Sequence, residues 1–238
     1  MSARAVCVEM GGGGAQTVVF DADGRPTFRD GASDAEDGPL LLAVPGIVHG
    51  DRVVAASNLG WYDVDPVREL GLKGPAEVLA NDAEAAALGE SVLRGLVDLA
   101  YLGLGTGIGG AVVLEGRVAQ TEVFGHRTGY SMDPCPCGRV GCLETVAAGW
   151  ALPDPVPAER IPAVAGALAK ALRDPALPDL VVVAGGLAAD NPAIVDELRA
   201  RATGRTIETS RAPAEAKSAA AWGLLRLAGL DAGATLPT

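Results

Sequence analysis

Four side chains of the kinds that bind soft metal ions lie close together in the second half of the chain. They are His126, Cys135, Cys137 and Cys142. Zinc commonly takes three thiolates and one imidazole in a tetrahedron. The cysteines are too crowded for a disulfide framework, and Gly138 and Gly141 flank the tight turns that would bring the thiolates to one point. The spacing predicts a structural zinc site with no open position for water. The alternative is three incidental thiols beside a surface histidine.

The elements that must position this cluster alternate between strands and helices. Short apolar and β-prone runs predict strands at residues 5–9, 16–21, 26–29, 40–44, 52–56, 77–80, 99–104, 109–114 and 180–184. Helical periodicity and capping residues predict helices at residues 66–70, 82–96, 143–150, 161–172, 192–202 and 213–227. This order of elements predicts an α/β fold.

A strand, a glycine-rich turn and a second strand follow one another twice, at residues 5–21 and 99–114. This weak internal repeat predicts two related lobes with a cleft between them. We expect an N-terminal α/β lobe over residues 1–98. A C-terminal α/β lobe, which carries the zinc loop, is expected over residues 99–238.

The composition excludes two classes of function. The net charge of the 238-residue chain is −11, so the chain lacks the basic footprint that neutralises nucleic-acid phosphates. Its longest apolar runs, such as residues 40–44, have the length of a strand and fall far short of the roughly 20 residues of a membrane span. Residues 1–10 show no basic segment followed by an apolar one, so we expect no secretory signal and a cytoplasmic protein.

Four segments resemble the signatures of one known family. Residues 125–144, GHRTGYSMDPCPCGRVGCLE, are similar to the zinc signature of the ROK family of sugar kinases, and residues 81–90, NDAEAAALGE, are similar to its NDANAAALGE segment. GTGIGG at residues 105–110 resembles its second phosphate motif, and VVVAGG at residues 181–186 resembles its adenosine motif. The resemblance extends over residues 5–229. It implies the two-lobed, actin-like ATPase fold, which is ribonuclease H-like, and a homodimer.

The resemblance also implies a reaction, in which the γ-phosphoryl group of ATP passes, with the help of Mg²⁺, to a hydroxyl group of a hexose or an amino sugar. Such a transfer needs a base beside the hydroxyl group, and Asp82 matches that position. Asp82 follows a strand and opens a helix, so the helix dipole is expected to keep the carboxylate ionised and to aim it into a cleft. A plain N-cap is the alternative, and one residue can fill both roles.

The remaining contacts with sugar and nucleotide are implied by the same resemblance. Sugar contacts are implied for Asn81, His126, Glu144 and Asn58. His126 would bind zinc through one ring nitrogen and the sugar through the other, so that the metal holds His126 and Glu144 toward Asp82. Contacts with ATP are implied for Glu9, Gly11, Gly12, Gly105, Thr106, Gly107, Gly109, Gly185 and Gly186. A simple glycine hairpin is the alternative for residues 105–109.

The first phosphate motif of the family, DxGGTK, is altered in this chain. Residues 9–14 read EMGGGG, so Glu9 replaces the aspartate, Gly13 the threonine and Gly14 the lysine. The longer side chain moves the carboxylate by about 1.5 Å, and a misplacement of about 1 Å can lower a rate about 100-fold. The missing threonine removes one phosphate donor, and the extra glycines give a looser loop.

A second change precedes the zinc histidine. The family has E-x-G-H, with the glutamate on the sugar, whereas Val123 stands at that position here and Glu122 lies one place away. A hydrogen bond to a charged group contributes roughly 1.5–3 kcal/mol, so the change is expected to weaken sugar binding about tenfold or more.

These changes leave two functions open. The first is an ATP-dependent sugar kinase, which is favoured because the base Asp82 survives while peripheral donors change. The second is a catalytically weakened sensor or regulatory protein that binds a sugar or a nucleotide, and Glu9, Gly13 and Val123 favour it. A repressor with an N-terminal winged helix is not expected, because the first predicted strand begins at about residue 5.

Overall fold

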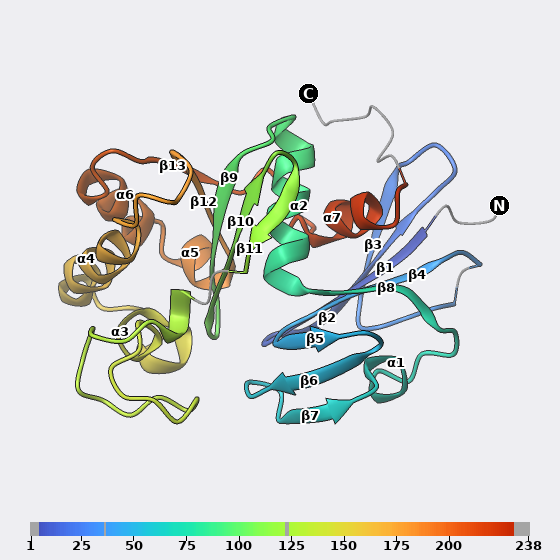
Figure 1. Ribbon diagram of the computed structural model, residues 1–238, viewed down its shortest axis with the longest axis horizontal. Helices are drawn as coiled ribbons and strands as arrows, with labels where there is room; N and C mark the ends of the chain where they lie inside the picture. Colours follow the sequence, from blue (N-terminus) through green and yellow to red (C-terminus); the bar gives the residue numbers. More distant parts are fainter. Residues whose placement is uncertain (1–4, 36, 122–123, 231–238) are drawn as a thin grey trace. The chain divides into compact units, whose positions relative to one another are not determined.

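The structure is a computed structural model that describes residues 5–35, 37–121 and 124–230, and its chain divides into two compact units (Figure 1). Unit 1 contains the described residues up to Leu96 and those from Arg211 onward, and unit 2 contains residues 97–210. The first boundary lies close to the division expected between residues 98 and 99. The segment from Arg211 onward, however, packs in unit 1, whereas the sequence analysis assigned it to the C-terminal lobe.

Unit 1 is built on a five-stranded sheet in the order β3-β2-β1-β4-β8. Its strands are β1 (Ala5–Gly11), β2 (Gly14–Phe20), β3 (Pro26–Asp30), β4 (Leu40–Val44) and β8 (Ala76–Asn81). The first three strands form antiparallel hairpins, and β4 and β8 then add parallel to β1. Because β1, β4 and β8 run in the same direction, their carboxyl ends share one edge of the sheet (Figure 1).

Helices α2 (Asp82–Arg94) and α7 (Ala220–Leu227) pack side by side against this sheet (Figure 1). Their backbones approach so closely that an added Cβ would lie 1.8 Å from a carbonyl oxygen both at Gly89 and at Gly223. The rings of Phe20 and Trp222 also meet edge to face, with centroids 5.6 Å apart. This packing of two helices and an aromatic pair explains why the end of the described chain belongs to unit 1.

Helix α7 is shorter than the helix predicted for residues 213–227. The backbone amide of Lys217 donates to the side-chain oxygen of Gln16 at 2.8 Å, and the amide of Ala220 donates to the hydroxyl of Ser218 at 2.9 Å. These side-chain acceptors replace helical carbonyl partners, so the helix begins only at Ala220.

Unit 1 also has a small antiparallel sheet of strands β5 (Ile47–His49), β6 (Arg52–Ala56) and β7 (Trp61–Val64), followed by α1 (Pro66–Glu69). Strand β6 and helix α1 were predicted. Strands β5 and β7 were not, because three or four residues with no clear alternation carry little periodic signal. The side chains of Val53 and Trp61 are buried in a cluster with Val44 of the main sheet.

Unit 2 repeats the plan of unit 1, with a sheet in the order β11-β10-β9-β12-β13. Its strands are β9 (Leu99–Leu104), β10 (Ile108–Leu114), β11 (Arg117–Gln120), β12 (Leu180–Ala184) and β13 (Thr206–Thr209). Two antiparallel hairpins come first, and two parallel strands add beside β9. In both units the order is third, second, first, fourth and fifth strand, so the internal repeat predicted from the glycine turns is confirmed.

The helices of unit 2 cover a single apolar core. They are α3 (Glu144–Ala147), α4 (Ile161–Ala171), α5 (Gly186–Asp190) and α6 (Pro192–Arg201), with short 3-10 turns at Phe124–His126, Gly149–Ala151 and Ala158–Arg160. The helix predicted for residues 143–150 stops at Ala147, because Ala148 is extended and the amide of Gly149 donates to Gly105 at 2.9 Å. Among the described residues, no helix combines the length and apolar character needed to cross a membrane.

Candidate functional site

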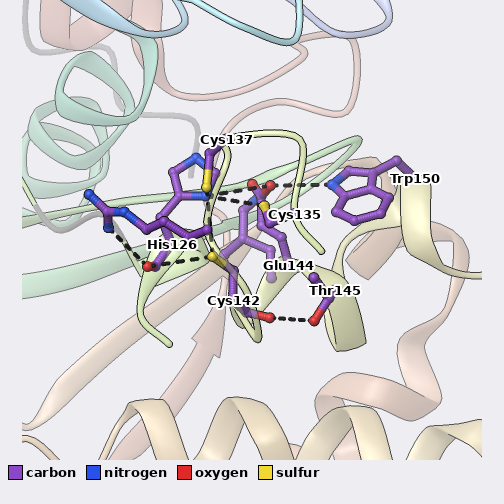
Figure 2. A network of polar contacts seen from close by, with 9 residues as sticks. His126, Cys135, Cys137, Cys142, Glu144, Thr145 and Trp150 are labelled. Carbon is purple, nitrogen blue, oxygen red and sulfur yellow. Dashed lines mark hydrogen bonds and ion pairs between the residues drawn. The ribbon is translucent and has the colours of Figure 1, made fainter. Parts of the chain in front are cut away.

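The four predicted metal ligands come together in unit 2 (Figure 2). Their ligand atoms all lie within 4.8 Å of one another. The sulfurs of Cys137 and Cys142 are 3.7 Å apart, and the sulfur of Cys135 is 3.8 Å from Nδ1 of His126. Zinc–sulfur bonds of about 2.3 Å in a tetrahedron place neighbouring ligand atoms about 3.8 Å apart. The cluster therefore has the donor set and the spacing that a tetrahedral zinc ion requires.

Tight turns bring the three cysteines to this point. The amide of Gly138 donates to Cys135 at 2.9 Å, and the amide of Cys135 donates to Arg139 at 2.8 Å. Gly138 has φ 86° and Gly141 has φ 73°, conformations that residues with a side chain rarely adopt. A Cβ on Gly141 would also lie 2.3 Å from the carbonyl oxygen of Ser131. Both glycines are therefore needed for the shape of the loop.

Without a cation, the buried cysteine cluster disfavours the thiolate form that binds metals. None of its thiols forms a disulfide. Burial, followed by hydrogen bonds to the neighbouring thiols, raises the pKa of Cys142 to about 12, so the thiol alone would remain protonated at neutral pH. A bound metal ion reverses this preference, because its charge stabilises the thiolate form. The donor set thus fits a metal ion better than it fits free thiols.

Glu144 connects the metal loop to the glycine turn that follows β9. Figure 2 shows its carboxylate between His126 and Trp150. Its Oε1 accepts a 2.7 Å hydrogen bond from the amide of Ile108, and its Oε2 accepts a 3.2 Å bond from the indole of Trp150. Oε2 also lies 3.9 Å from Nδ1 of His126. The sequence analysis missed Trp150, and no motif could have indicated it, because the contact arises only where α3 ends and the chain turns back.

The turn at residues 105–107 is shaped by these same neighbours. The amides of Gly149 and Trp150 donate to the carbonyls of Gly105 and Thr106 at 2.9 and 3.1 Å. A Cβ on Gly107 would lie 2.7 Å from Oε1 of Glu144, so a side chain there would push this carboxylate out of its place. The turn is a hairpin, as the plain alternative expected. The backbone amide of Gly105 in the turn already donates to the carbonyl oxygen of Gly107. The amide of Ile108, just after the turn, already donates to Glu144.

The two glycine motifs of unit 2 meet at one edge of its sheet. Strands β9 and β12 are parallel, and Gly103 lies beside Ala184 in the register. Gly185 then adopts φ 97°, and a Cβ there would lie 2.3 Å from the carbonyl oxygen of Leu104. Gly186 begins α5. Ligands of α/β proteins bind at the carboxyl ends of parallel strands, and this edge carries both motifs.

Two carboxylates of unit 1 lie at the equivalent edge of its sheet. Glu9 is near the end of β1, and Asp82 directly follows β8, with the parallel strand β4 between them. Burial, with a smaller contribution from the charge of Asp82, raises the pKa of Glu9 to about 7. A hydrogen bond from Ser218 and the charge of Lys217 oppose this rise. The charge of Asp82 therefore makes Glu9 harder to ionise.

The shift of Asp82 has the opposite direction to the one expected from the helix dipole. Burial raises the pKa of Asp82 to about 6, and its 2.9 Å hydrogen bond from the amide of Ala83 lowers it by less. Loss of water around the carboxylate outweighs the amide groups at the start of α2. Asp82 is still mostly ionised at pH 7, and a pKa close to neutrality suits a general base.

Asn81 is the N-cap of α2. Its Oδ1 accepts hydrogen bonds from the amides of Ala83 and Glu84 at 2.9 and 3.1 Å, and its Nδ2 donates to Gly46 at 2.8 Å. These contacts hold the side chain beside Asp82. The predicted contact with a sugar adds to this capping role and stays a prediction.

The remaining predicted residues fall in three places. Asn58 is exposed on the turn between β6 and β7. Gly11 and Gly14 face each other at the end of the β1–β2 hairpin, with Gly12 in the turn between them. Glu122 and Val123, to which the sequence analysis assigned a weakened sugar contact, lie outside the described residues.

Comparisons of sequence relate this chain to known proteins. The profile of the ROK family matches residues 27–160. The kanosamine kinase of Amycolatopsis mediterranei is 30% identical over 245 residues, which cover 82% of this chain and 78% of that kinase. A putative xylose repressor from Caldicellulosiruptor sp. is 37% identical over 123 residues, which cover 47% of this chain. The matched part is 31% of the repressor, so the chain spans only about a third of that relative.

The comparison of structures gives the fold. A ROK family glucokinase from Streptomyces griseus, solved in complex with glucose and AMPPNP, matches with a TM-score of 0.73 at 20% sequence identity. The match covers 94% of this chain and 98% of the glucokinase. The predicted two-lobed, actin-like ATPase fold of the α/β class is thereby confirmed.

Proposed function

This chain belongs to the ROK family, and from this premise we propose that it is an ATP-dependent kinase of a hexose or an amino sugar. The observation that carries the proposal is the position of Asp82. Its carboxylate follows the last parallel strand of unit 1, opens α2 and has a pKa of about 6. A base in this state accepts a proton from a hydroxyl group near neutral pH.

The proposed step is a direct transfer between oxygens. Asp82 accepts the proton of the sugar hydroxyl while the hydroxyl oxygen forms a bond to the γ-phosphorus of ATP. The bond between that phosphorus and the bridging oxygen breaks, and ADP leaves with the electron pair. Mg²⁺ supplies positive charge for the phosphate oxygens in such reactions. Glu9, near the end of β1 on the other side of β4, is the carboxylate that we assign to the side of the metal and phosphates.

We assign the nucleotide to the glycine turns. Backbone amides of glycine turns bind phosphate oxygens well, because no side chain keeps the oxygens away. This role falls to Gly11 and Gly12 in unit 1 and to Thr106, Gly107 and Gly109 in unit 2, with Gly105 shaping the turn. Gly185 and Gly186 leave room for adenosine at the end of β12.

We assign the sugar to the polar side chains at the two sheet edges and in the metal loop. Asn81 and His126 are the principal candidates, Glu144 supports the loop and contributes a carboxylate, and the exposed Asn58 is a further candidate. Glucose, kanosamine and N-acetylmannosamine are the natural first ligands, because kinases related to this chain carry these names. A homodimer, which the family resemblance implies, remains a proposal.

We also propose that His126, Cys135, Cys137 and Cys142 hold a structural zinc ion. All four tetrahedral positions are then taken by protein ligands, so the ion holds the loop and takes no part in the transfer. Because Nδ1 of His126 faces the sulfurs, Nε2 is the nitrogen left for a sugar hydroxyl. The metal supports sugar binding by fixing this ring.

A sensor that binds sugar or nucleotide without rapid turnover is the second candidate. The pKa of Glu9, about 7, favours it, because a carboxylate that is half protonated at neutral pH is a weaker partner for Mg²⁺ than the aspartate of the family motif. The similarity to the putative xylose repressor supports the same candidate, because a repressor has a regulatory role.

The test is release of ADP with a panel of glucose, kanosamine, N-acetylmannosamine and related hexoses, together with direct measurements of sugar binding. A kinase releases ADP with at least one sugar, and Asp82→Asn slows that release about 10²–10⁴-fold while sugar binding persists. Sugar binding without release of ADP from any member of the panel favours the sensor. Undiminished turnover in Asp82→Asn contradicts the assignment of the base.

A further inference from the structure

A lysine side chain from the far end of the described chain lies over the first glycine turn. Nζ of Lys217 donates a 2.5 Å hydrogen bond to the carbonyl oxygen of Gly14. The same nitrogen is 3.9 Å from the place that a Cβ of Gly11 would occupy. Gly11 and Gly14 close the β1–β2 hairpin, so the ammonium group sits beside the turn between them. Its charge also lowers the pKa of Glu9.

Contacts of its neighbours hold Lys217 in this position. The backbone amide of Lys217 donates to Oε1 of Gln16 at 2.8 Å, and Nε2 of Gln16 donates to the carbonyl oxygen of Glu215 at 2.8 Å. The Gln16 residue is only 7% exposed. The buried side-chain amide of Gln16, in β2, thus forms two hydrogen bonds with the segment that precedes α7. The lysine stem therefore starts from a fixed place, and the residue is exposed to solvent.

The backbone of the turn explains why the cation comes from another segment. The ROK motif that residues 9–14 resemble has a lysine at the position of Gly14. Here Gly14 has φ 103°, which residues with a side chain rarely adopt. A Cβ at Gly14 would meet no atom within 4 Å, so backbone conformation and not crowding is the obstacle. A lysine at this position would strain the turn.

We propose that Lys217 binds the phosphate groups of the nucleotide at the turn of residues 11–14, in place of a lysine within the turn itself. This inference rests on the proposed kinase function. Lysine binds phosphate as a mobile point charge, and the glycine amides beside it supply directed donors. On binding, Nζ exchanges the carbonyl oxygen of Gly14 for a phosphate oxygen, and the interaction becomes one between opposite charges.

The experiment compares phosphate ligands with and without the adenosine group. Dissociation constants of ADP with Mg²⁺, inorganic tripolyphosphate and adenosine are measured by calorimetry for the wild type, Lys217→Ala and Lys217→Arg. We expect Lys217→Ala to weaken ADP and tripolyphosphate about ten- to hundredfold, as for one lost charge-assisted hydrogen bond, and to leave adenosine unchanged. Lys217→Arg should retain most of the affinity. Lys73→Ala removes an exposed lysine of the same unit and should change none of the three constants.

The outcomes separate this inference from the proposed function. Unchanged binding of ADP and tripolyphosphate in Lys217→Ala overturns the inference, and the kinase proposal stands if sugar-dependent release of ADP continues with the same KM for ATP. Phosphate binding that depends on Lys217, without transfer to any sugar, supports the inference and contradicts the kinase. A wild-type protein that binds neither ADP nor tripolyphosphate overturns both. If Lys217→Ala does not fold, Lys217→Gln, which keeps the stem, replaces it.

Discussion

Oε1 of Glu144 accepts a 2.7 Å hydrogen bond from the backbone amide of Ile108, directly after the second glycine turn. With the indole of Trp150 on its other oxygen, Glu144 joins three segments of unit 2: the metal loop, the glycine turn and the chain that follows α3. A residue assigned to the sugar by family resemblance therefore also positions the turn that we assign to phosphate. In the proposed function, one carboxylate would therefore link metal binding to phosphate binding.

This linkage predicts that Glu144→Ala lowers stability and weakens nucleotide binding together. The substitution leaves the buried amide of Ile108 without its acceptor, and an unsatisfied buried group costs about 1–3 kcal/mol. It also removes the bond from the indole of Trp150, which is exposed enough for water to replace the carboxylate. We expect a fall in Tm and a higher Kd for ADP. Calorimetry and thermal unfolding check both values. Glu197→Gln, at a partly exposed ion pair of α6, is the control and should shift stability by less than about 0.5 kcal/mol. A loss of sugar affinity alone would show that the positioning role is absent.

Removal of the metal should unfold the loop that carries His126. Without zinc the thiols of Cys135 and Cys142, whose pKa values burial raises, return to their protonated forms, and nothing holds the turns at one point. We expect Cys137→Ser to lose the bound ion and to unfold about 10 °C lower, which corresponds to a few kcal/mol in a chain of this size. Metal analysis and thermal unfolding are the measurements.

The matched control for the metal is Cys7→Ala. Cys7 is buried in β1, outside the cluster, and burial raises the pKa of its thiol. This variant should retain one zinc ion per chain even if it is less stable. Stoichiometric zinc in Cys137→Ser would show that Cys137 is not a ligand.

The pH dependence of the reaction should report the ionisation of Asp82. The base must be deprotonated to accept a proton, and the pKa of Asp82 is about 6. The value of kcat/KM should therefore reach its plateau above pH 6 and fall about tenfold per pH unit below it. Asp82→Asn should lower kcat by about 10²–10⁴. A steady-state pH profile checks the first statement. Asp179→Asn, at an exposed side chain, is the control and should leave the profile unchanged. A flat profile between pH 5 and 8 would rule out Asp82 as the titrating base.

The stability of the protein should fall as Glu9 ionises. The pKa of Glu9 is about 7 in the folded protein, above its ordinary value of 4.5, so the folded state favours the protonated form. The contribution of protonated Glu9 to the free energy of unfolding is complete below pH 4.5 and is lost as the pH rises through 7. Glu9→Gln should therefore stabilise the protein more at pH 8 than at pH 5, by roughly 2 kcal/mol. Denaturant unfolding at the two pH values measures this difference.

The exposed Glu77→Gln serves as the control for this prediction. Its effect on the free energy of unfolding should be the same at both pH values. An equal gain for Glu9→Gln at pH 5 and pH 8 would mean that Glu9 is not desolvated in the folded state.

Local spacing was sufficient to predict much of this molecule. The four metal ligands, the two glycine turns and the alternation of strands and helices can each be read within a short window, because neighbours along the chain constrain the chemistry and the periodicity. The strands that escaped prediction, β5, β7, β11 and β13, have only three or four residues. They form because a partner strand is present beside them, and that partner is not visible in a short window.

The sequence by itself thus determined the family, the grouping of three cysteines and a histidine, and the position of Asp82 at the start of α2. Only the tertiary structure decided that Lys217 lies on Gly14, 203 residues away, and that Trp150 and Ile108 share the carboxylate of Glu144. It also raised the pKa of Asp82, where sequence reasoning had expected the helix to lower it. The physical reason is common to all three: burial and long-range packing depend on which distant segments meet, and no local pattern encodes that meeting.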